Sequence, residues 1–585
     1  MKYRFLLWLF LGGALFGKGK PNVVVFLSDD QGWGDFSMNG NTNLSTSNLD
    51  QMAKEGASFE SFYVCPVCSP TRAEFLTGRY HARSGVYSTS AGGERMDLDE
   101  TTIAETFKAA GYATGAFGKW HNGMQAPYHP NSRGFEEFYG FCSGHWGNYF
   151  DPLLEHNGRL VKGKGFCVDD FTDKAMDFIE GSVKKGKPFF AYLPYNTPHS
   201  PMQVPDKFWK KHKDNPLEMR NLHSKKMNID HTRAAMAMCE NIDWNVGRLL
   251  GKLEELKVDR DTIVLYFNDN GPNGVRWNGG LKGRKGSTDE GGVRSPLLVR
   301  WPAKICPGKT IKQIAGAIDL HPTLAAMCGI PVAKSKPLDG LDVSSLLMDG
   351  QMPDNLADRK IFTRWRKGGS VRTQRFRMDS TYKLYELAKD PGQQTDVSKQ
   401  HPELANQLAE ELKAWELEME KELDQPKRPF QLGHKDLKLT QVPARDAQPH
   451  GGIKRSNKFP NDSYFGNWKD AEKDFLTWQV MVEESGKYDV ELWYACGKDA
   501  VGTKLELSFG DGTLVSSVKK ANPANEKGME HDRVKRSESY VKDFVPMKMG
   551  STQLDKGPGE LKLRALDIPG EEAIEFRLLM FERLD

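Results

Sequence analysis

The sequence predicts an α/β domain with a mostly parallel central sheet flanked by helices, followed by an all-β sandwich domain. Over residues 19–426, continuous apolar runs alternate with helical patterns, which is typical of α/β domains. Over residues 456–585, short segments alternate apolar with polar residues instead, and turn residues separate them. Alternation of that kind is typical of antiparallel sheets with one buried face.

The first 18 residues are typical of a cleaved export signal. Lys2 and Arg4 give a positive start, an apolar stretch follows at 5–16, and small residues lie near its end. The stretch is short for a membrane span, although an uncleaved anchor is the alternative. No later segment is apolar for long enough to cross a bilayer. We therefore expect an exported protein, periplasmic or extracellular, without stable membrane association.

Three apolar runs predict strands of the parallel sheet, and polar residues follow each of them. The runs span 22–27, 188–193 and 262–267, and helical patterns span 170–179 and 232–256. The polar residues after the three runs are Asp29, Asp30, His199, Asp269 and Asn270. Ligands bind at the carboxyl ends of the strands in such sheets, so these side chains are candidate site residues.

The domain boundaries follow from changes of pattern. A charged amphipathic helix predicted at 404–422 ends the α/β domain, which we assign to 19–426. Residues 427–455 are rich in proline, glycine and charge, and predict a linker or a connection that follows the surface. The sandwich is expected at 456–585. Its clearest strand patterns span 478–482, 488–493, 504–509 and 560–564.

Charge and cysteine content exclude two classes of protein. The 585 residues carry a formal net charge of +3, and basic side chains are balanced by acids, so nucleic acid is not an expected partner. Eight cysteines are too few for a disulfide scaffold in a chain of this length, and their pairing stays open.

The most informative segment is Cys65-Pro-Val-Cys68-Ser-Pro-Thr-Arg72, with Leu76-Thr-Gly-Arg79 after it. A Cys-x-x-Cys pair suggests half of a zinc site or a redox pair. A zinc site needs a second close pair of ligands, and none lies at a useful spacing. A redox pair belongs to a thioredoxin-like fold, which is far smaller than this chain.

The segment closely resembles the signature of the type I, formylglycine-dependent sulfatases, which are arylsulfatase-like members of the alkaline-phosphatase-like superfamily. The resemblance implies that Cys68 is oxidised to formylglycine by a formylglycine-generating, sulfatase-maturing enzyme. Pro70 and Arg72 match the positions that this enzyme recognises, and Arg72 is counted with the catalytic residues. Thr71 stands where serine is commoner. The resemblance thus implies that the protein is a sulfuric ester hydrolase that acts on a sulfated small molecule or glycan.

The implied nucleophile explains why cysteine is modified. The hydrate of an aldehyde carries two hydroxyls, of which one attacks sulfur. Loss of a proton from the other expels sulfate and regenerates the aldehyde. A serine would leave a sulfate ester that needs a separate hydrolysis, so the hydrate makes both steps accessible.

Oxygen-bearing side chains predict a metal site. A sulfate ester needs fixed positive charge near it, and hard oxygen ligands select Ca²⁺ or Mg²⁺ over zinc. The resemblance implies one Ca²⁺ held by Asp29, Asp30, Asp269 and Asn270, with the modified Cys68 completing the site. Strand-end turns also favour Asp and Asn, which is the alternative for each residue alone.

Four further side chains match catalytic positions of the family. In Gly118-Lys-Trp-His121, the resemblance implies that Lys119 holds a sulfate oxygen and that His121 takes the proton of the spare hydroxyl, as suits an imidazole. His199 and Lys285 match the positions that neutralise or protonate the leaving oxygen. Lys282 and Arg284 flank Lys285, so the register there is open.

Substrate contacts are predicted from mixed aromatic and polar segments, because sugars stack on rings and hydrogen-bond through hydroxyls. The candidates are His145, Trp146, Trp277 and Arg364. Aromatic core residues near loops are the alternative for each. The sandwich is similar in pattern to carbohydrate-binding-like domains of secreted glycan-degrading enzymes, and a sulfated carbohydrate is the expected substrate.

Two other functions stay open at this stage. A formylglycine-dependent phosphonate monoester hydrolase or phosphodiesterase shares a similar motif. An inactive sulfatase-like protein that binds glycans through its sandwich would keep an unmodified thiol at residue 68.

Overall fold

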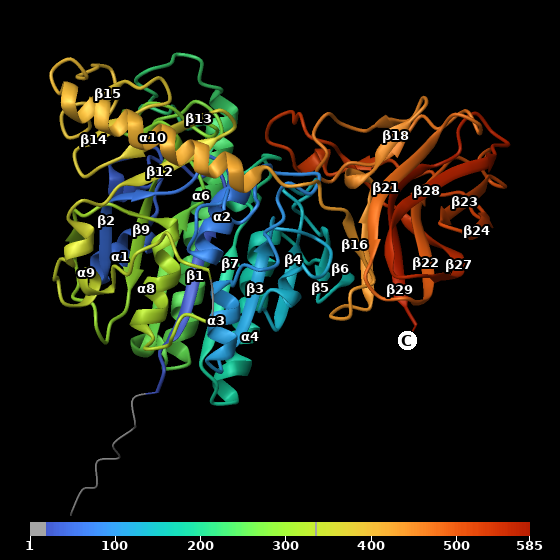
Figure 1. Cartoon of the computed structure of the whole chain (residues 1–585), viewed down its shortest axis with the longest axis horizontal. Coiled ribbons are helices and arrows are strands. Elements are labelled where there is room, and N and C mark those ends of the chain that lie inside the picture. Colours follow the sequence, from blue (N-terminus) through green and yellow to red (C-terminus); the bar gives the residue numbers. More distant parts are fainter. Residues whose placement is uncertain (1–18, 334–335, 585) are drawn as a thin grey trace, which may run out of the picture.

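A mixed sheet organises the N-terminal part of the chain (Figure 1). The computed structural model describes residues 19–333 and 336–584, so the predicted signal peptide at 1–18 lies outside the described residues. Within these residues the sheet has eleven strands. In spatial order they are β10 (Lys309–Ile311), β2 (Ala57–Tyr63), β9 (Arg294–Arg300), β8 (Thr262–Asn268), β1 (Asn22–Ser28), β7 (Phe189–Pro194), β3 (Ala113–Lys119), β4 (Glu137–Phe141), β5 (Leu153–His156) and β6 (Arg159–Lys162), with β11 (Ala315–Gly316) paired to β2.

The centre of the sheet is parallel, as predicted. Strand β1 pairs in parallel with β7 and β8, and β3 pairs in parallel with β7 and β4. The antiparallel pairs lie toward the edges, between β8 and β9, β2 and β9, β4 and β5, and β5 and β6. The carboxyl ends of the central strands therefore meet at one edge of the sheet, which is where the candidate residues follow them.

Strand β1 shows why the sequence reads as a continuous apolar run. Val23, Val25 and Leu27 pack into the core on one face, whereas Val24 and Phe26 pack into the core on the other. Burial on both faces removes the polar alternation of a surface strand.

Helices cover both faces of the sheet. On the face of Val25 lie α2 (Cys68–Thr77), α3 (Ile103–Ala109), α8 (Leu320–Met327) and α9 (Ser344–Met348). On the face of Val24 lie α1 (Ser47–Glu55), α4 (Cys167–Lys184), α5 (Asp206–His212) and α6 (Ile229–Glu255). The short α7 (Glu290–Val293) precedes β9. No described helix has the length and the apolar content that crossing a bilayer requires.

A second, smaller sheet follows the main one in the chain. Its antiparallel strands are β12 (Ile361–Trp365), β13 (Gly368–Arg372), β14 (Phe376–Met378) and β15 (Leu384–Glu386). The long helix α10 (Pro402–Leu423) packs on this sheet through Leu408, Leu412 and Trp415. This helix confirms the amphipathic pattern predicted at 404–422.

The C-terminal part is a β-sandwich, which confirms the predicted fold class. One sheet contains β16 (Phe430–Leu432), β18 (Gln448–His450), β21 (Phe475–Val482), β28 (Gly557–Asp567), β23 (Lys504–Phe509) and β24 (Gly512–Ser517). The other contains β17 (Leu439–Pro443), β19 (Lys454–Arg455), β20 (Phe465–Gly466), β29 (Glu575–Arg583), β22 (Gly486–Ala495) and β27 (Val545–Leu554). The buried rings of Trp478 and Phe576 meet between them. A separate hairpin pairs β25 (Glu526–Lys527) with β26 (Val541–Lys542).

Residues 427–455, expected to be a linker, form part of the sandwich instead. Strand β16 pairs with β21, β17 with β29, and β18 with β21, so the segment adds strands to both sheets. These strands are short and carry little alternation, which is why the sequence pattern did not show them.

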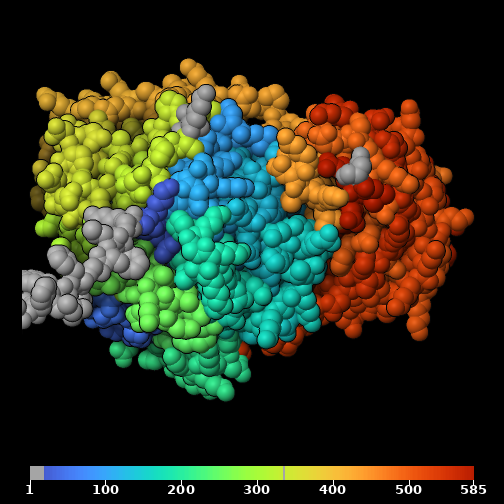
Figure 2. All heavy atoms as spheres, turned by 90° about the horizontal axis from the view of Figure 1, so that it is seen from below, coloured from blue at the N-terminus to red at the C-terminus, as the bar shows by residue number. Residues whose placement is uncertain are grey.

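The sandwich lies against the edge of the main sheet formed by β4, β5 and β6, and the two parts are in continuous contact (Figures 1 and 2). At that edge Gln441 of β17 donates to Glu155 of β5 over 2.8 Å.

Candidate active site

Cys68 lies at the first position of α2, at the edge where the central strands end. Val67 before it is extended and makes no side-chain cap, so the amino-terminal N–H groups of the helix face the site. The amino end of a helix carries partial positive charge, which favours an anionic ligand. The Cys68 side chain is buried, and burial raises the pKa of the thiol.

Three acidic side chains gather beside Cys68 from two strand ends. Asp29 and Asp30 follow β1, and Asp269 follows β8. Ligand atoms of Asp29, Cys68 and Asp269 lie within 4.8 Å of one another. Asp30 takes a left-handed backbone conformation, with φ of 65°, and its N–H donates to Asp269 Oδ1 over 3.1 Å. The turn after β1 thus folds both carboxylates of Asp29 and Asp30 toward one point.

Oxygens of this cluster lack the partners that buried oxygens need. Asp29 Oδ1, Asp30 Oδ2 and Asn270 Oδ1 are buried and accept no hydrogen bond from any described residue. The Asn270 amide nitrogen donates to Asp30 Oδ1 over 2.8 Å, which leaves its oxygen free for another partner. Buried oxygens without donors are costly, and a divalent cation satisfies several of them at once. The residues present therefore fit a hard cation with oxygen ligands.

Cationic side chains surround the acidic cluster. Lys119 forms an ion pair with Asp29, and Lys285 Nζ lies 2.6 Å from Asp30 Oδ1. Burial alone would raise the pKa of both carboxyls, but Lys119 lowers that of Asp29 and Lys285 lowers that of Asp30, each with help from His199. Both are therefore ionised. Burial and the charge of Asp29 raise the pKa of Asp269 to about 7.

His121 is held as a neutral base. It follows β3 with φ of 64°, and its Nε2 lies 2.8 Å from the carbonyl oxygen of Thr89. A carbonyl can only accept, so Nε2 carries the proton, whereas Nδ1 is buried and has no partner among the described residues. Burial, followed by the charge of Lys119, lowers the pKa of His121 well below its ordinary value.

His199 faces the same cluster from the end of β7. Its Nε2 lies 3.8 Å from Asp30 Oδ2, and its Nδ1 lies 2.7 Å from the carbonyl oxygen of Ser200. The carbonyl places the proton on Nδ1 in the neutral ring. Burial and then Lys285 lower the pKa of His199. The ring of His145 stacks on that of His199, with centroids 6.0 Å apart.

Of the four predicted substrate residues, the structure brings His145 to the site. Trp146 stacks on Phe141 and lies under the Arg577 guanidinium, so it contributes to the contact with the sandwich. Trp277 is buried at 8% exposure. Arg364 of β12 is buried and donates to backbone oxygens, including that of Glu416 in α10. These three side chains make contacts within the structure, and their role as substrate contacts stays a prediction.

The sequence did not show which contacts support the site. Arg276 forms a buried ion pair with Asp35 and donates to the carbonyl oxygen of Asp30 over 2.8 Å, which holds the turn after β1. The Thr71 hydroxyl donates to the carbonyl oxygen of Asp269 over 2.5 Å and so joins α2 to the end of β8. These contacts link residues far apart in the chain, and spacing in the sequence gives no signal of them.

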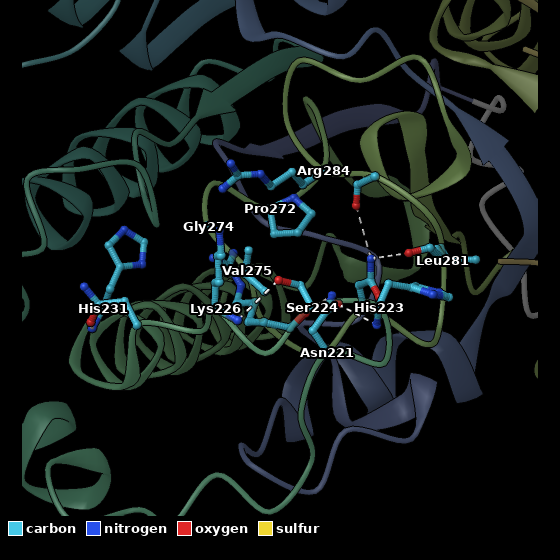
Figure 3. Close-up of a pocket in the computed structure, with 14 residues that line it drawn as sticks. Asn221, His223, Ser224, Lys226, His231, Pro272, Gly274, Val275, Leu281 and Arg284 are labelled. Atoms are coloured by element: carbon cyan, nitrogen blue, oxygen red, sulfur yellow. Dashed lines mark hydrogen bonds between the residues drawn. The ribbon is translucent and has the colours of Figure 1, made fainter. Parts of the chain in front are cut away.

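A cavity of about 520 Å³ opens beside the site (Figure 3). Pro272, two residues after Asn270, and Arg284, next to Lys285, are in its wall. Figure 3 shows the Arg284 side chain extending along one side, with His231 at another. Its lining is Asn221, His223, Ser224, Lys226, Asn228, His231, Pro272, Gly274, Val275, Arg276, Asn278, Leu281, Gly283 and Arg284. Its lining includes Lys226, Arg276 and Arg284 and, among the described residues, no acidic one, and its size suits a small organic group.

Comparisons with known proteins identify the family of the chain. The family model described as Sulfatase matches residues 21–330, and that described as N-sulphoglucosamine sulphohydrolase, C-terminal, matches residues 285–419. The chain is 32% identical over 376 residues to the N-acetylgalactosamine-6-sulfatase of Mus musculus, covering 58% of this chain and 68% of that protein.

Solved structures place the same fold on the same part of the chain. Ps i-CgsB, solved in complex with k-i-k-neocarrahexaose, has a TM-score of 0.64 and 30% identity, covering 70% of this chain and 95% of its own. The phosphonate monoester hydrolase of Agrobacterium radiobacter, at 19% identity and a TM-score of 0.52 over 68% of this chain and 96% of its own, shares the fold alone. The chain therefore belongs to the sulfatase family of sulfuric ester hydrolases.

Proposed function

We propose that the chain hydrolyses sulfate esters of a sulfated carbohydrate, with formylglycine at residue 68 as the source of the nucleophile and one Ca²⁺ as its metal. One observation carries the proposal. Buried side-chain oxygens of Asp29, Asp30 and Asn270 accept no hydrogen bond from the described residues. They lie in the same cluster as Cys68, at the amino end of α2. A cation site and a reactive side chain are thus combined at a point that favours an anion.

The metal ligands and their role follow from the donor set. Asp29, Asp30, Asp269 and Asn270 would hold Ca²⁺ together with the modified residue 68, because hard oxygen ligands suit that ion. When bound, the ion supplies positive charge that stabilises the sulfate group in the transition state. Arg72 donates to Asp269 Oδ2 over 2.9 Å and orients that carboxylate.

Two lysines neutralise the charge of the substrate. Lys119, at the end of β3, pairs with Asp29, and Lys285, in the loop before α7, pairs with Asp30. Each ammonium has more than one N–H, so it can bind a sulfate oxygen while it keeps its carboxylate partner. Burial in a site that excludes water strengthens both interactions.

The two histidines hold protons at different stages. His121 Nδ1 is unprotonated and has no partner, so it accepts the proton of the spare hydroxyl. The carbonyl of Ser200 fixes the Nδ1–H of His199, so Nε2, which faces Asp30, delivers a proton to the leaving oxygen from the doubly protonated ring, and His199 is left neutral with its proton on Nδ1. A proton supplied there makes a sugar alcohol a competent leaving group.

The substrate class is inferred from the relatives and the cavity. The relative named above acts, by its name, on a sulfated N-acetylgalactosamine, and a neighbouring structure was solved with a neocarrahexaose. The cavity beside the site carries Lys226 and Arg284, whose side-chain cations form no ion pair or hydrogen bond with the described residues, and both suit an anionic saccharide. We therefore place the sugar that bears the sulfate toward this cavity.

The proposal is tested on protein produced together with a sulfatase-maturing enzyme. Mass spectrometry of the peptide containing residue 68 is expected to show formylglycine, which is lighter than cysteine. Sulfated saccharides are expected to release sulfate, and an aryl phosphonate to be a poor substrate. Cys68→Ala is the matched control. A modified residue 68 with no sulfate release from any ester, or faster cleavage of the phosphonate, would contradict the proposal.

Export is part of the same proposal. Lys2, Arg4 and the apolar stretch at 5–16 support cleavage of a signal peptide and a periplasmic or extracellular location. Amino-terminal sequencing of the secreted protein is expected to begin close to residue 19.

A further inference from the structure

A long loop of the sandwich extends onto the N-terminal domain. Residues 528–540 join β25 to β26, and we call them the arm. Val534 packs against the core cluster around β1 and α6, and the His531 ring stacks on Phe150, with centroids 4.1 Å apart. The Arg533 N–H donates to the carbonyl oxygen of Met202 over 2.9 Å. The arm is therefore docked by both apolar and polar contacts.

Gln203 joins the arm to two segments of the N-terminal domain. Its fully buried side chain donates from Nε2 to the carbonyl oxygen of Gly528 over 2.6 Å and to Asp532 Oδ1 over 2.9 Å. Its Oε1 accepts from the N–H of Tyr149 over 2.7 Å. The Gln203 side chain thus joins the segment that follows His199 directly to the segment that follows His145, and it binds the arm to both.

Glu538 of the arm reaches the residue next to His199. The Ser200 hydroxyl donates to Glu538 Oε1 over 2.5 Å. The Ser200 carbonyl oxygen accepts from His199 Nδ1 over 2.7 Å and from the Tyr149 hydroxyl over 2.9 Å. The group that orients the His199 ring therefore belongs to a residue whose side chain is held by the sandwich.

The sandwich also contacts the residue whose carbonyl oxygen binds His121. Asn461 of the sandwich donates to the carbonyl oxygen of Thr89 over 3.4 Å, and the same oxygen accepts from His121 Nε2. Asp462 accepts from the N–H of Gly147 over 2.5 Å. Both histidines assigned to proton transfer are thus bound to backbone carbonyls of residues that the sandwich contacts, Thr89 and Ser200.

We propose that the arm is a positioning element of the active site, and that Glu538, through Ser200, holds His199 in the orientation that protonates the leaving oxygen. This inference rests on the proposed role of His199. The matched family models end at residue 419, so the arm lies outside them. A catalytic group must be held within about 0.5 Å of its working position, and hydrogen bonds behind it supply that precision.

The test compares two leaving groups in the matured, full-length protein. A sugar alcohol is a basic leaving group that needs a proton, whereas 4-nitrophenolate leaves without one. Glu538→Ala is expected to lower kcat/KM about tenfold for a sulfated monosaccharide and less than about threefold for 4-nitrophenyl sulfate, because general acid catalysis contributes about 10²–10⁴-fold when intact. Glu538→Gln keeps an acceptor for Ser200 and is expected to stay near wild type.

Lys535→Ala provides the matched control, since this exposed side chain of the same arm has no recorded contact with the described residues. Equal losses on both substrates, or a loss in Lys535→Ala as large as in Glu538→Ala, would overturn the inference. If Glu538→Ala fails to fold, Ser200→Ala removes the same hydrogen bond from its other end and gives the same comparison.

A second readout is independent of activity. A crystal structure of Glu538→Ala is expected to show the His199 ring turned away from the Ser200 carbonyl. A ring that keeps its wild-type orientation overturns the inference even if no ester is hydrolysed. Failure of the wild-type protein to release any sulfate would count against the proposed function instead, so the two failures are distinguishable.

Discussion

The Arg72 guanidinium donates to Asp269 Oδ2 over 2.9 Å, and both side chains are completely buried. Burial lowers the pKa of Arg72, but the groups around it, Asp269 first, together more than reverse this effect. Arg72 also donates to the carbonyl oxygen of Lys119 over 2.7 Å. One side chain of α2 therefore holds the ends of β8 and β3 together beneath Cys68.

We expect Arg72→Ala to lower the free energy of unfolding by about 3 kcal/mol or more, because it leaves a buried carboxylate unpaired. Chemical denaturation of the unmodified protein measures this. The double variant Arg72→Ala/Asp269→Asn is expected to recover part of the loss, since no charge is then left unpaired. Exposed Arg159→Ala is the control. A double variant no more stable than the single one would contradict the ion-pair argument.

Removal of Ca²⁺ is expected to lower both activity and thermal stability. A ligand that binds only the folded state stabilises it by about 2.7 kcal/mol at a hundred times its Kd. Thermal unfolding with Ca²⁺ and with a chelator gives the difference. Asn270→Ala removes one ligand and is expected to raise the Ca²⁺ concentration required, whereas Asn273→Ala is not. A melting temperature insensitive to Ca²⁺ would refute this metal assignment.

His121→Ala is expected to separate the two steps of turnover. If His121 acts only in the second step, the variant still releases the first product. With 4-nitrophenyl sulfate we expect a burst of about one nitrophenol per enzyme, followed by slow turnover. Stopped-flow absorbance measures it. Variants that show no burst at any enzyme concentration would assign His121 to the first step.

Glu74 is expected to make stability fall as the pH rises. Its buried carboxyl has its pKa raised by burial to about 8 from 4.5, so the folded state holds a proton that the unfolded state loses. The contribution of Glu74 to the free energy of unfolding therefore falls as the pH rises from 4.5 to 8, by up to about 1.4 kcal/mol per pH unit. Burial lowers the pKa of His81 to about 4 from 6.5, so His81 acts in the opposite sense below pH 6.5.

The window from pH 6.5 to 8 thus isolates Glu74 within this pair. Melting temperatures of wild type and Glu74→Gln at both pH values test it, with exposed Glu60→Gln as control. Between these two pH values the free energy of unfolding of the wild type is expected to fall by about 2 kcal/mol more than that of Glu74→Gln. Identical pH profiles for the two proteins would show that Glu74 is ionised in the folded state.

Alanine substitutions of the cavity residues Lys226 and Arg284 are expected to change KM, whereas substitution of Arg364 is expected to change thermal stability. Lys226→Ala and Arg284→Ala should raise KM several-fold for an anionic saccharide with little change in melting temperature. Arg364→Ala should lower the melting temperature and leave KM unchanged, because the side chain is buried against α10. Steady-state kinetics and thermal unfolding decide it. A rise of KM in Arg364→Ala alone would restore this residue as a substrate contact.

The fold class and the clustering of the candidate residues could be predicted because they depend on local patterns. Burial of β1 on both faces leaves an apolar run in the sequence, and turn-forming Asp29 and Asp30 mark where it ends. The motif around Cys68 is contiguous as well. Each of these signals lies within a few residues of the feature that it predicts.

What the sequence did not show depends on contacts between distant segments. Strands β16 to β18 are short and join sheets formed by residues far along the chain. The contact between Glu538 and Ser200 spans 338 residues, so no local pattern records it. The substrate predictions for Trp146 and Arg364 rested on side-chain type alone. In the structure both side chains pack against other parts of the protein.

The burial of Cys68, at 3% exposure, has a consequence for the order of events in the life of the protein. Pro70 and Arg72, which flank it, are buried as well. A modifying enzyme cannot bind a segment that is buried in the interior of a folded protein. Any catalyst that oxidises this cysteine must therefore meet the chain while it is still extended, and folding ends the opportunity.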